Sequence, residues 1–434
     1  MAYNRKQRLN DNIKAIETAF ILDREQRTPT ARERLLLERY CGFGGLKCIL
    51  NPARELADAV HWAKSDLELF APTVELHRLI RENSKNESEY KQLMDSLKQS
   101  VLTAFYTPSA VTEALMDVLK EHQIIPEKVL EPSAGIGAFV DSVLDNNPKA
   151  DIMAFEKDLL TGKILRHLHP EQKVRIEGFE KIEKPFNDYF DLAISNIPFG
   201  DVAVFDPSYT AMKGMRALVT RRIHNYFFVK ALDTVRDGGL VAFITSQGVL
   251  NAKNNSAARF MMLYHADLVS AIRLPNNLFT ENANTEVGSD LIILQKNSQK
   301  ESLRGDDNLL DTVYNDENRI PTNNYFLEHP ERIIHTTAKL DTDPFGKPAM
   351  IYTHEDGVEG IAEDLRKMLH EDFKKNLNLN RYLGIEETKA EEVKEVEETE
   401  KIEKTEKMKP SIEEKQNDTV ISLQKQEKPT DDAE

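Results

Sequence analysis

The sequence has only two cysteines, Cys41 and Cys48, among its 434 residues. Two cysteines cannot build the disulfide framework of a small secreted protein, so we expect the reducing environment of the cytoplasm. Long apolar runs are also missing, and the first eight residues are polar and basic. We therefore expect neither a membrane-spanning segment nor a secretion signal.

Basic residues are in the minority, and the net charge is −16. The tail 385–434 contains seventeen acidic and nine basic residues, which is half of the net charge, and it has no aromatic residue. A segment of this composition cannot bury a core, so we expect it to be disordered. The rest of the chain is acidic too, so a nucleic acid would have to bind a local basic patch.

Hydrophobic spacing divides the remaining chain into three parts. Residues 1–100 have apolar side chains at helical spacing, and Thr30 to Glu33 form a capping box that opens a helix ending near Tyr40, which predicts a helical N-terminal domain. Residues 101–300 alternate short strands with amphipathic helices, which predicts an α/β domain with a parallel, helix-covered sheet. Residues 301–384 are mixed and polar, so we expect a small C-terminal extension.

Ligands of open α/β sheets bind beyond the carboxyl ends of the strands, so the residues that follow strands are the candidates for a site. The candidate strands are Lys128–Glu131, Asp151–Phe155, Lys173–Ile176, Asp191–Ser195, Leu240–Thr245, Asp267–Arg273 and Asp290–Gln295. The candidate helices between them include Ser109–Glu121, Ile136–Asp145 and Ile223–Arg236.

The first candidate strand ends at Glu131 and leads into a turn that contains Ala134, Gly135 and Gly137. Glycines at a strand-to-helix turn let a ligand approach the backbone, although tight packing alone would also explain them. The second candidate strand is followed by Glu156, twenty-one residues after Gly135, which is the expected spacing of a ribose-binding acid. The turn lacks a third glycine and a phosphate-binding lysine. It therefore favours S-adenosylmethionine over a dinucleotide.

The fourth candidate strand leads into Asn196-Ile197-Pro198-Phe199. An amide, a proline-fixed turn and a ring suit a flat target that forms hydrogen bonds and stacks, such as a purine base. Two further segments would complete the cofactor site. Phe105-Tyr106-Thr107-Pro108 would wall the methionine end, and Glu180, after the third candidate strand, would meet the adenine amino group of the cofactor.

Three segments, taken in chain order, resemble three motifs of the gamma-type adenine-N6 DNA methyltransferases. They are the aromatic-proline segment, the Glu131 to Gly137 turn and the Asn196 to Phe199 turn. The segment from Gly238 to Ser246 is also similar to that family. A looser resemblance, carried by Gly42-Phe43-Gly44-Gly45-Leu46 and by the stretch 324–331, is to the methylase part of large methylase–helicase proteins of bacterial mobile elements.

The first resemblance implies a Rossmann-like, S-adenosylmethionine-dependent fold. It also implies methyl transfer to the N6 amino group of an adenine flipped out of DNA. The Asn196 side-chain oxygen and the Ile197 carbonyl would accept hydrogen bonds from the amino group, and Phe199 would stack on the base. Two positions depart from the family. Ile197 replaces a proline, and the acid usual at position 178 is Gly178 here, with Glu180 two residues later.

DNA phosphates would bind the basic cluster Lys213, Arg216, Arg221 and Arg222, for which a solvated loop is the alternative. We expect no metal, because His167 and His169 form a pair without further ligands, and we expect this pair at the surface.

Residues 301–384 are too few for an ordinary recognition domain, so we expect weak, salt-sensitive DNA binding unless a helicase or recognition subunit supplies specificity. Two other functions fit the same residues. The chain would be a protein-glutamine methyltransferase if its target were a side-chain amide. Alternatively, it would be a catalytically silent DNA-binding or antirestriction factor.

Overall fold

The computed structural model describes residues 4–103, 106–212, 214–280, 286–303, 307–314, 320–343 and 346–385. Phe105, Lys213 and the tail 386–434 lie outside these ranges, and the expectations for them stay predictions. The described residues up to Gly384 belong to one compact unit.

The described N-terminal part is helical. The predicted capping box is present, because the Thr30 hydroxyl accepts a hydrogen bond from the Glu33 N–H and the Glu33 carboxylate accepts one from the Thr30 N–H. The helix ends at Leu37, a few residues before the predicted end. The elements are α1 (Arg5–Glu25), α2 (Ala31–Leu37), η1 (Lys47–Leu50), η2 (Leu56–His61), η3 (Lys64–Leu69), α3 (Phe70–Glu82) and α4 (Glu87–Thr103).

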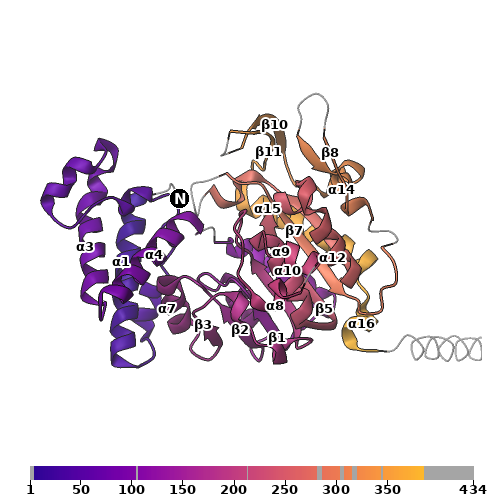
Figure 1. The fold of residues 1–434 in the computed structure, drawn as a ribbon, viewed down its shortest axis with the longest axis horizontal. Helices are drawn as coiled ribbons and strands as arrows, with labels where there is room; N and C mark the ends of the chain where they lie inside the picture. The colour runs from indigo at the N-terminus through magenta and orange to yellow at the C-terminus, as the bar shows by residue number, and fades with distance from the viewer. Residues whose placement is uncertain are drawn as a thin grey trace, which may run out of the picture. The chain divides into compact units, whose positions relative to one another are not determined.

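A seven-stranded sheet follows, in the order β3-β2-β1-β4-β5-β7-β6 (Figure 1). All seven predicted strands are present, and the α/β fold class is confirmed. The prediction of a parallel sheet is wrong for β7, which pairs antiparallel with β5 and with β6. A buried apolar strand has the same residue pattern in either direction, so the sequence could not reveal the reversal. The strands are β1 (Lys128–Glu131), β2 (Asp151–Phe155), β3 (Lys173–Arg175), β4 (Phe190–Asn196), β5 (Val235–Ser246), β6 (Ala266–Leu274) and β7 (Ser289–Lys296).

Consecutive strand residues point to opposite faces, and each face has its own apolar core. Leu192 and Ile194 pack with α5 (Ser109–Glu121), α6 (Ala138–Asn146) and α15 (Gly357–Asn376). Ala193 packs on the other face with α10 (Ile223–Thr234) and α12 (Ser256–His265). Burial on both faces is the reason why the strands read as nearly continuous apolar runs.

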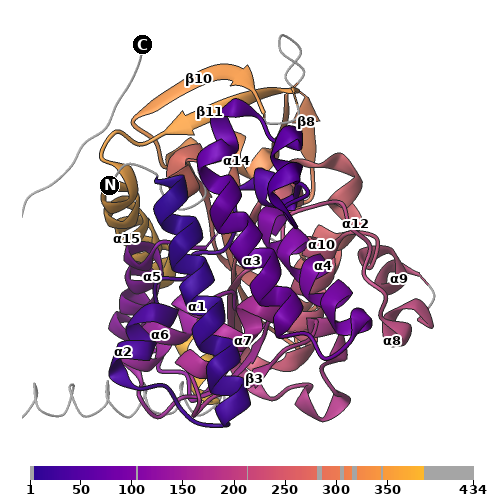
Figure 2. The ribbon, with the colours of Figure 1, turned by 90° about the vertical axis from the view of Figure 1, so that its left-hand side faces the viewer.

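The N-terminal helices attach to the sheet through α7 (Leu159–Leu168), which connects β2 to β3. Leu160, Ile164 and Leu168 of α7 belong to the same apolar core as residues of α1, α3 and α4. Figure 2 shows α1, α3 and α4 side by side, with α7 next to α1. The helical region is therefore packed against the element that follows the second strand, beside the candidate ribose-binding acid.

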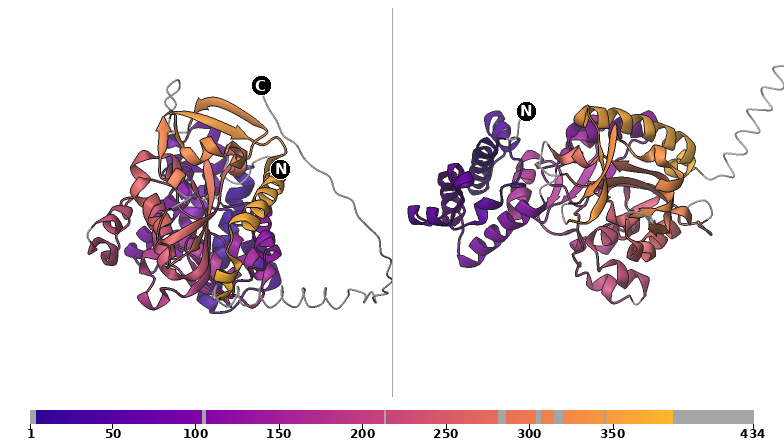
Figure 3. Two further views of the ribbon diagram at one scale, coloured as in Figure 1. Left: turned by 90° about the vertical axis from the view of Figure 1, so that its right-hand side faces the viewer. Right: turned by 90° about the horizontal axis from the view of Figure 1, so that it is seen from above.

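The C-terminal part adds two hairpins and a long helix. The β10–β11 hairpin lies at one end of the sheet (Figure 3). The helix α15 follows the hairpin and packs on α5 and β6 of the sheet domain. None of the described helices is long and apolar enough to cross a membrane. The remaining elements are η4 (Phe179–Lys181), η5 (Lys184–Phe186), α8 (Pro207–Thr210), α9 (Met215–Val219), α11 (Gly248–Asn251), η6 (Lys253–Asn255), η7 (Asn276–Phe279), η8 (Asp307–Leu309), β8 (Thr312–Tyr314), β9 (Pro321–Asn323), α14 (Asn324–Glu328), η9 (Pro330–Arg332), β10 (Thr337–Thr342), β11 (Pro348–Thr353) and α16 (Leu379–Leu383).

Candidate functional site

One cavity of about 810 Å³ lies at the carboxyl ends of β1, β2 and β4. Its size is typical of a site for a small ligand. It brings together residues of all three predicted motifs, although the chain separates Tyr106 from Phe199 by more than ninety residues. The predicted residues Pro108 and Gly137 do not line it. The predicted residues that line it are Tyr106, Thr107, Glu131, Ala134, Gly135, Glu156, Glu180, Asn196, Ile197, Pro198 and Phe199.

Two glycines shape the turn after β1. Gly135 and Gly137 have φ angles of +56° and +94°, which other residues rarely adopt. A Cβ on Gly135 would overlap the Tyr106 ring, and a Cβ on Gly137 would overlap Leu165 and His169. The packing explanation therefore holds for both glycines, and the same turn also lines the cavity at Gly135. The helix α6 starts at Ala138, two residues later than predicted, because Gly137 takes the left-handed conformation.

Glu156 follows β2 and is half-buried at the cavity wall. Its Oε2 accepts a hydrogen bond from the Gly135 N–H at 2.8 Å, and its Oε1 accepts one from the Asp158 N–H at 2.7 Å. The carboxylate is thus fixed against the glycine turn. Burial, together with the nearby Asp158 charge, raises the pKa of Glu156 to about 8.

Glu131 and Thr107 bring unused polar atoms to the same cavity. Both side chains are buried, and neither Glu131 Oε2 nor Thr107 Oγ1 has a hydrogen-bond partner within the described part of the chain. Burial, with further contributions from Asp141 and Glu156, raises the pKa of Glu131 well above its ordinary value. Buried polar atoms are rarely left without a partner, so these two atoms indicate a polar ligand.

The turn after β4 is held from both sides. The Ile197 N–H donates to the Ile244 carbonyl at 3.0 Å, and the Ile197 side chain is buried in the core that includes α10. Phe199 packs edge-on against Phe279, with 6.3 Å between the ring centres. The isoleucine that departs from the family pattern therefore fills an apolar core, and the residue still lines the cavity.

Glu180 lies where the acid expected at position 178 would lie. Its carboxylate occupies the space directly beside the Gly178 α-carbon, because a Cβ on Gly178 would overlap both carboxylate oxygens. Lys157 forms a 3.5 Å ion pair with the same carboxylate. The shift by two residues in the sequence is thus largely cancelled in space.

The contribution of α4 was not predicted from the sequence. This helix adds a row of polar side chains to the cavity, namely Gln92, Asp95, Ser96, Gln99 and Ser100. Their three- and four-residue spacing places them on one helix face, which is a signal that the sequence contains. The Ser96 hydroxyl donates to Asp158 Oδ2 at 2.7 Å and accepts from the Leu160 N–H at 3.0 Å. Through Asp158, α4 is connected to Glu156.

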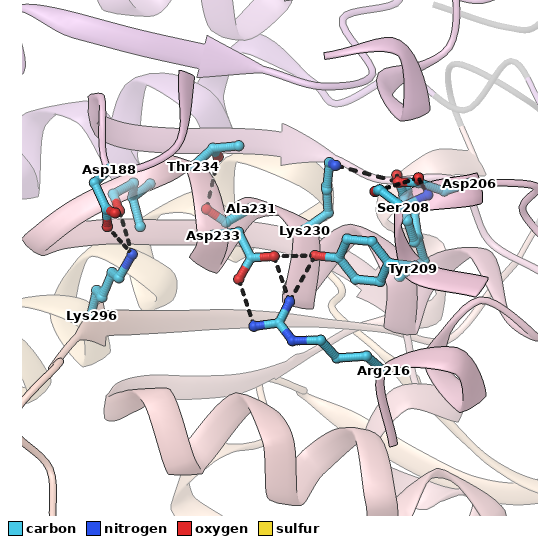
Figure 4. Close-up of polar contacts among 12 residues, drawn as sticks. Asp188, Asp206, Ser208, Tyr209, Arg216, Lys230, Ala231, Asp233, Thr234 and Lys296 are labelled. Atoms are coloured by element: carbon cyan, nitrogen blue, oxygen red, sulfur yellow. Dashed lines mark hydrogen bonds and ion pairs between the residues drawn. The ribbon is translucent and has the colours of Figure 1, made fainter. Parts of the chain in front are cut away.

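The predicted basic cluster is only partly available for DNA. Arg216 donates two hydrogen bonds, at 2.6 and 2.9 Å, to Asp233, which also accepts one from Tyr209 (Figure 4). Arg222 forms a 3.2 Å ion pair with Asp201. Arg221 is exposed. The phosphate-binding role stays a prediction for Arg221, while the guanidinium of Arg216 is used within the protein.

The expected surface position of the two histidines is wrong. His169 is buried under Gly137, and burial lowers its pKa to about 4. His167 is half-buried and contacts Asp23 of α1 at 2.8 Å, and Lys163 and Arg166 also form ion pairs with Asp23. His167 helps to attach α7 to α1, and its partner Asp23 lies too far away in the sequence to be recognised from spacing.

One family model matches most of the chain. The model of the family described as N-6 DNA Methylase matches residues 88–391. The chain is 29% identical over 201 residues to Defense against restriction protein B of Escherichia phage P1, an alignment that covers 45% of this chain and 8% of that protein. It is 25% identical over 173 residues to the Type II methyltransferase M.XamI of Xanthomonas campestris pv. amaranthicola, covering 37% of this chain and 33% of that protein. The chain therefore spans at most about a third of these relatives.

Among solved structures, the type I restriction-modification methyltransferase subunit from Streptococcus thermophilus aligns with a TM-score of 0.39 and 11% identity, over 86% of this chain and 94% of that one. The family match extends from α4 through every described turn that lines the cavity. The protein therefore belongs to the N-6 DNA Methylase family.

Proposed function

We propose that the protein transfers a methyl group from S-adenosylmethionine to the N6 amino group of adenine in DNA. The observation that carries this proposal is the shared cavity. The glycine turn and Glu156 line one part of it, and Asn196 to Phe199 line another. A nucleoside cofactor and a planar target would thereby be held side by side, as direct group transfer requires.

The cavity residues fit S-adenosylmethionine by charge and by hydrogen bonding. Burial raises the pKa values of Glu131, Glu156 and Asp158, so all three carboxyl groups would gain from a positively charged ligand. This cofactor carries a sulfonium and an ammonium group, and its ribose has two hydroxyls. Glu156 would hold the ribose, and the unpartnered oxygen of Glu131 would face the methionine end.

Further residues would complete the cofactor site. Tyr106 packs on Gly135 and would wall the methionine end with Thr107 and Pro108, and Phe105 stays a prediction. Glu180 would accept a hydrogen bond from the adenine amino group of the cofactor. When bound, the cofactor would supply an electrophilic methyl group.

The chain's own residues would orient the target amine. The N6 lone pair of adenine is delocalised into the ring and is a poor nucleophile. Hydrogen bonds from the amino group to Asn196 Oδ1 and the Ile197 carbonyl would favour a tetrahedral nitrogen with a localised lone pair. Pro198 would hold the turn and Phe199 would stack on the base. Preorganised acceptors supply the catalysis. The methylated nitrogen would be positively charged and acidic, so its surplus proton would pass to water without a general base.

Exposed cations at the cavity would meet the DNA backbone. Lys157 and Lys181 line the cavity and are exposed, and Arg221 is exposed on the connection to α10. We therefore assign phosphate contacts to these three residues in place of Arg216. Such contacts orient the duplex without reading its sequence.

The decisive experiment uses cofactor with a labelled methyl group, plasmid DNA and a glutamine-containing protein mixture. We expect label in DNA, and mass spectrometry of the digested nucleosides should identify N6-methyl-2′-deoxyadenosine. Label in protein alone would favour the glutamine methyltransferase. No label in either, with cofactor bound to folded protein, would favour the silent factor.

A second function is favoured by one relative. Defense against restriction protein B is named for protection against restriction, and 45% of this chain aligns with it. An antirestriction role is compatible with DNA methylation, because a methylated site is altered for a nuclease that reads it. Protection of DNA in cells that is retained by Asn196→Ala would separate this role from catalysis.

A further inference from the structure

An aromatic side chain stands exposed at the cavity, and neither the motifs nor the mechanism uses it. Phe205 is 79% exposed and lines the same cavity as Asn196 and Phe199. Val202, 61% exposed, lines it too. Both belong to the segment that follows the Asn196 to Phe199 turn. Large apolar side chains so exposed beside a binding cavity indicate a surface that meets a partner.

The backbone around Phe205 is anchored from beneath. The neighbouring Asp206 is buried, and its carboxylate accepts hydrogen bonds from the Tyr226 hydroxyl at 2.7 Å and from Lys230 Nζ at 3.3 Å. On the other side, the Val204 N–H donates to the Thr220 carbonyl at 2.8 Å. The exposure of Phe205 is therefore set by a fixed backbone.

A second set of contacts fastens the rest of the segment to α10. Arg216 and Tyr209 both bind Asp233 of that helix, and Asp206 accepts hydrogen bonds from the Ser208 N–H and hydroxyl (Figure 4). Polar contacts thus point inward, toward α10, while Phe205 and Val202 stay in solvent. The backbone that carries Val202 and Phe205 is therefore fixed to α10, and it holds these two apolar side chains in solvent beside the cavity.

The partner that Phe205 and Val202 would contact follows from the proposed function, on which this inference rests. An adenine that reaches Asn196 must leave its base stack, and the duplex must then lie across the cavity opening. Lys157 and Lys181, which line the same cavity, suit the phosphates of that duplex. Proteins that open or kink DNA commonly place an apolar side chain between the bases they separate. We propose that Phe205 inserts into the duplex beside the target adenine and stabilises its flipped-out state, with Val202 in contact next to it.

The experiment compares wild-type protein with Phe205→Ala and Phe205→Trp on a duplex whose methylated adenine has been mapped. A second duplex carries the same adenine opposite an abasic site, where leaving the stack costs less. We expect Phe205→Ala to lose at least about tenfold in methylation of the paired duplex and to recover to within about threefold of wild type on the abasic one. Tryptophan should retain most of the activity on both, because it keeps a stacking ring.

Two controls make the result specific. Leu56→Ala removes an 84% exposed apolar side chain of η2, which does not line the cavity, and should leave methylation unchanged. The affinity of Phe205→Ala for S-adenosylmethionine should equal that of wild type. Equal losses on both duplexes, or none on either, would overturn the inference and leave the proposed function intact. A wild-type protein that methylates no DNA would overturn the proposed function, and this inference with it.

Discussion

The carboxylate of Glu180 lies directly beside the α-carbon of Gly178, so closely that a side chain at position 178 would displace it. Gly178 itself has an ordinary backbone conformation, with φ at −77°. The glycine is therefore required by its neighbour and not by its own dihedral angles. In this chain the pair acts as one unit, in which the second residue supplies the acid and the first leaves room for it.

The Glu180–Gly178 relationship predicts the effect of Gly178→Ala. The new methyl group should push the Glu180 carboxylate away. The affinity for S-adenosylmethionine should then fall by about tenfold, about 1.4 kcal/mol, as for the loss of one hydrogen bond to a charged group. In a Glu180→Ala background the same substitution should cost nothing more. Calorimetric titration of the four proteins gives this double-mutant cycle. Gly248→Ala, outside the cavity, is the control, and additive losses would contradict the prediction.

Glu156 should make stability depend on pH. Its pKa is raised from 4.5 to about 8, so the folded protein keeps a proton that the unfolded chain releases in this window. The contribution of Glu156 is fully present below about pH 4.5 and is lost as the pH rises toward 8. Without cofactor, the melting temperature should therefore fall between pH 5 and pH 8, and Glu156→Gln should flatten the fall. Identical profiles would show that Glu156 is already ionised at neutral pH.

Cofactor binding should release a proton from the same group. A positively charged ligand stabilises the ionised carboxylate and lowers the pKa of Glu156. Calorimetry at pH 7 in buffers of different ionisation enthalpy should detect proton release in wild type and less of it in Glu156→Gln. The substitution should also weaken binding by about 1–3 kcal/mol. Unchanged affinity would remove the ribose assignment alone.

Strand existence was predictable from sequence, whereas strand direction and distant partners were not. The strands other than β3 are largely buried on both faces, and each therefore forms an apolar run that is easy to recognise. Residues that follow β1, β2 and β4 meet at one edge, so the order of motifs already predicted which turns share the cavity. The reversal of β7, the contact of His167 with Asp23 and the pairing of Arg216 with Asp233 depend on the tertiary arrangement. Local spacing carries no trace of them.

Replacing Asn196 and Phe199 should separate chemistry from base binding. Asn196→Ala should keep cofactor affinity and lose about 100-fold or more in methylation rate, because it removes a preorganised acceptor at the reacting nitrogen. Phe199→Ala should weaken binding of the flipped base by about 1–3 kcal/mol. Phe199 also packs against Phe279, so the melting temperature of the Phe199→Ala variant must be measured together with its base binding. A wild-type methylation rate in Asn196→Ala would refute the mechanism.

Ser96 provides a test of whether the N-terminal helices belong to the cofactor site. Its hydroxyl connects α4 to Asp158, and the Asp158 N–H in turn donates to Glu156. Ser96→Ala leaves a buried carboxylate oxygen with one partner fewer, which should cost about 1–3 kcal/mol of stability. It should also weaken the binding of S-adenosylmethionine several-fold, because Asp158 and Glu156 are then less firmly held. Ser96→Thr keeps the hydroxyl and should have the stability and the cofactor affinity of wild type.

The matched control for Ser96 is Thr73→Ala. It removes an equally buried hydroxyl from α3, which donates to the Leu69 carbonyl and lies outside the cavity. Both variants should lower the melting temperature, but only Ser96→Ala should change cofactor affinity at a temperature where both proteins are folded. If the two variants bind cofactor like wild type, α4 only supports the fold. A loss confined to Ser96→Ala means that the helical region helps to position the residue that holds the ribose.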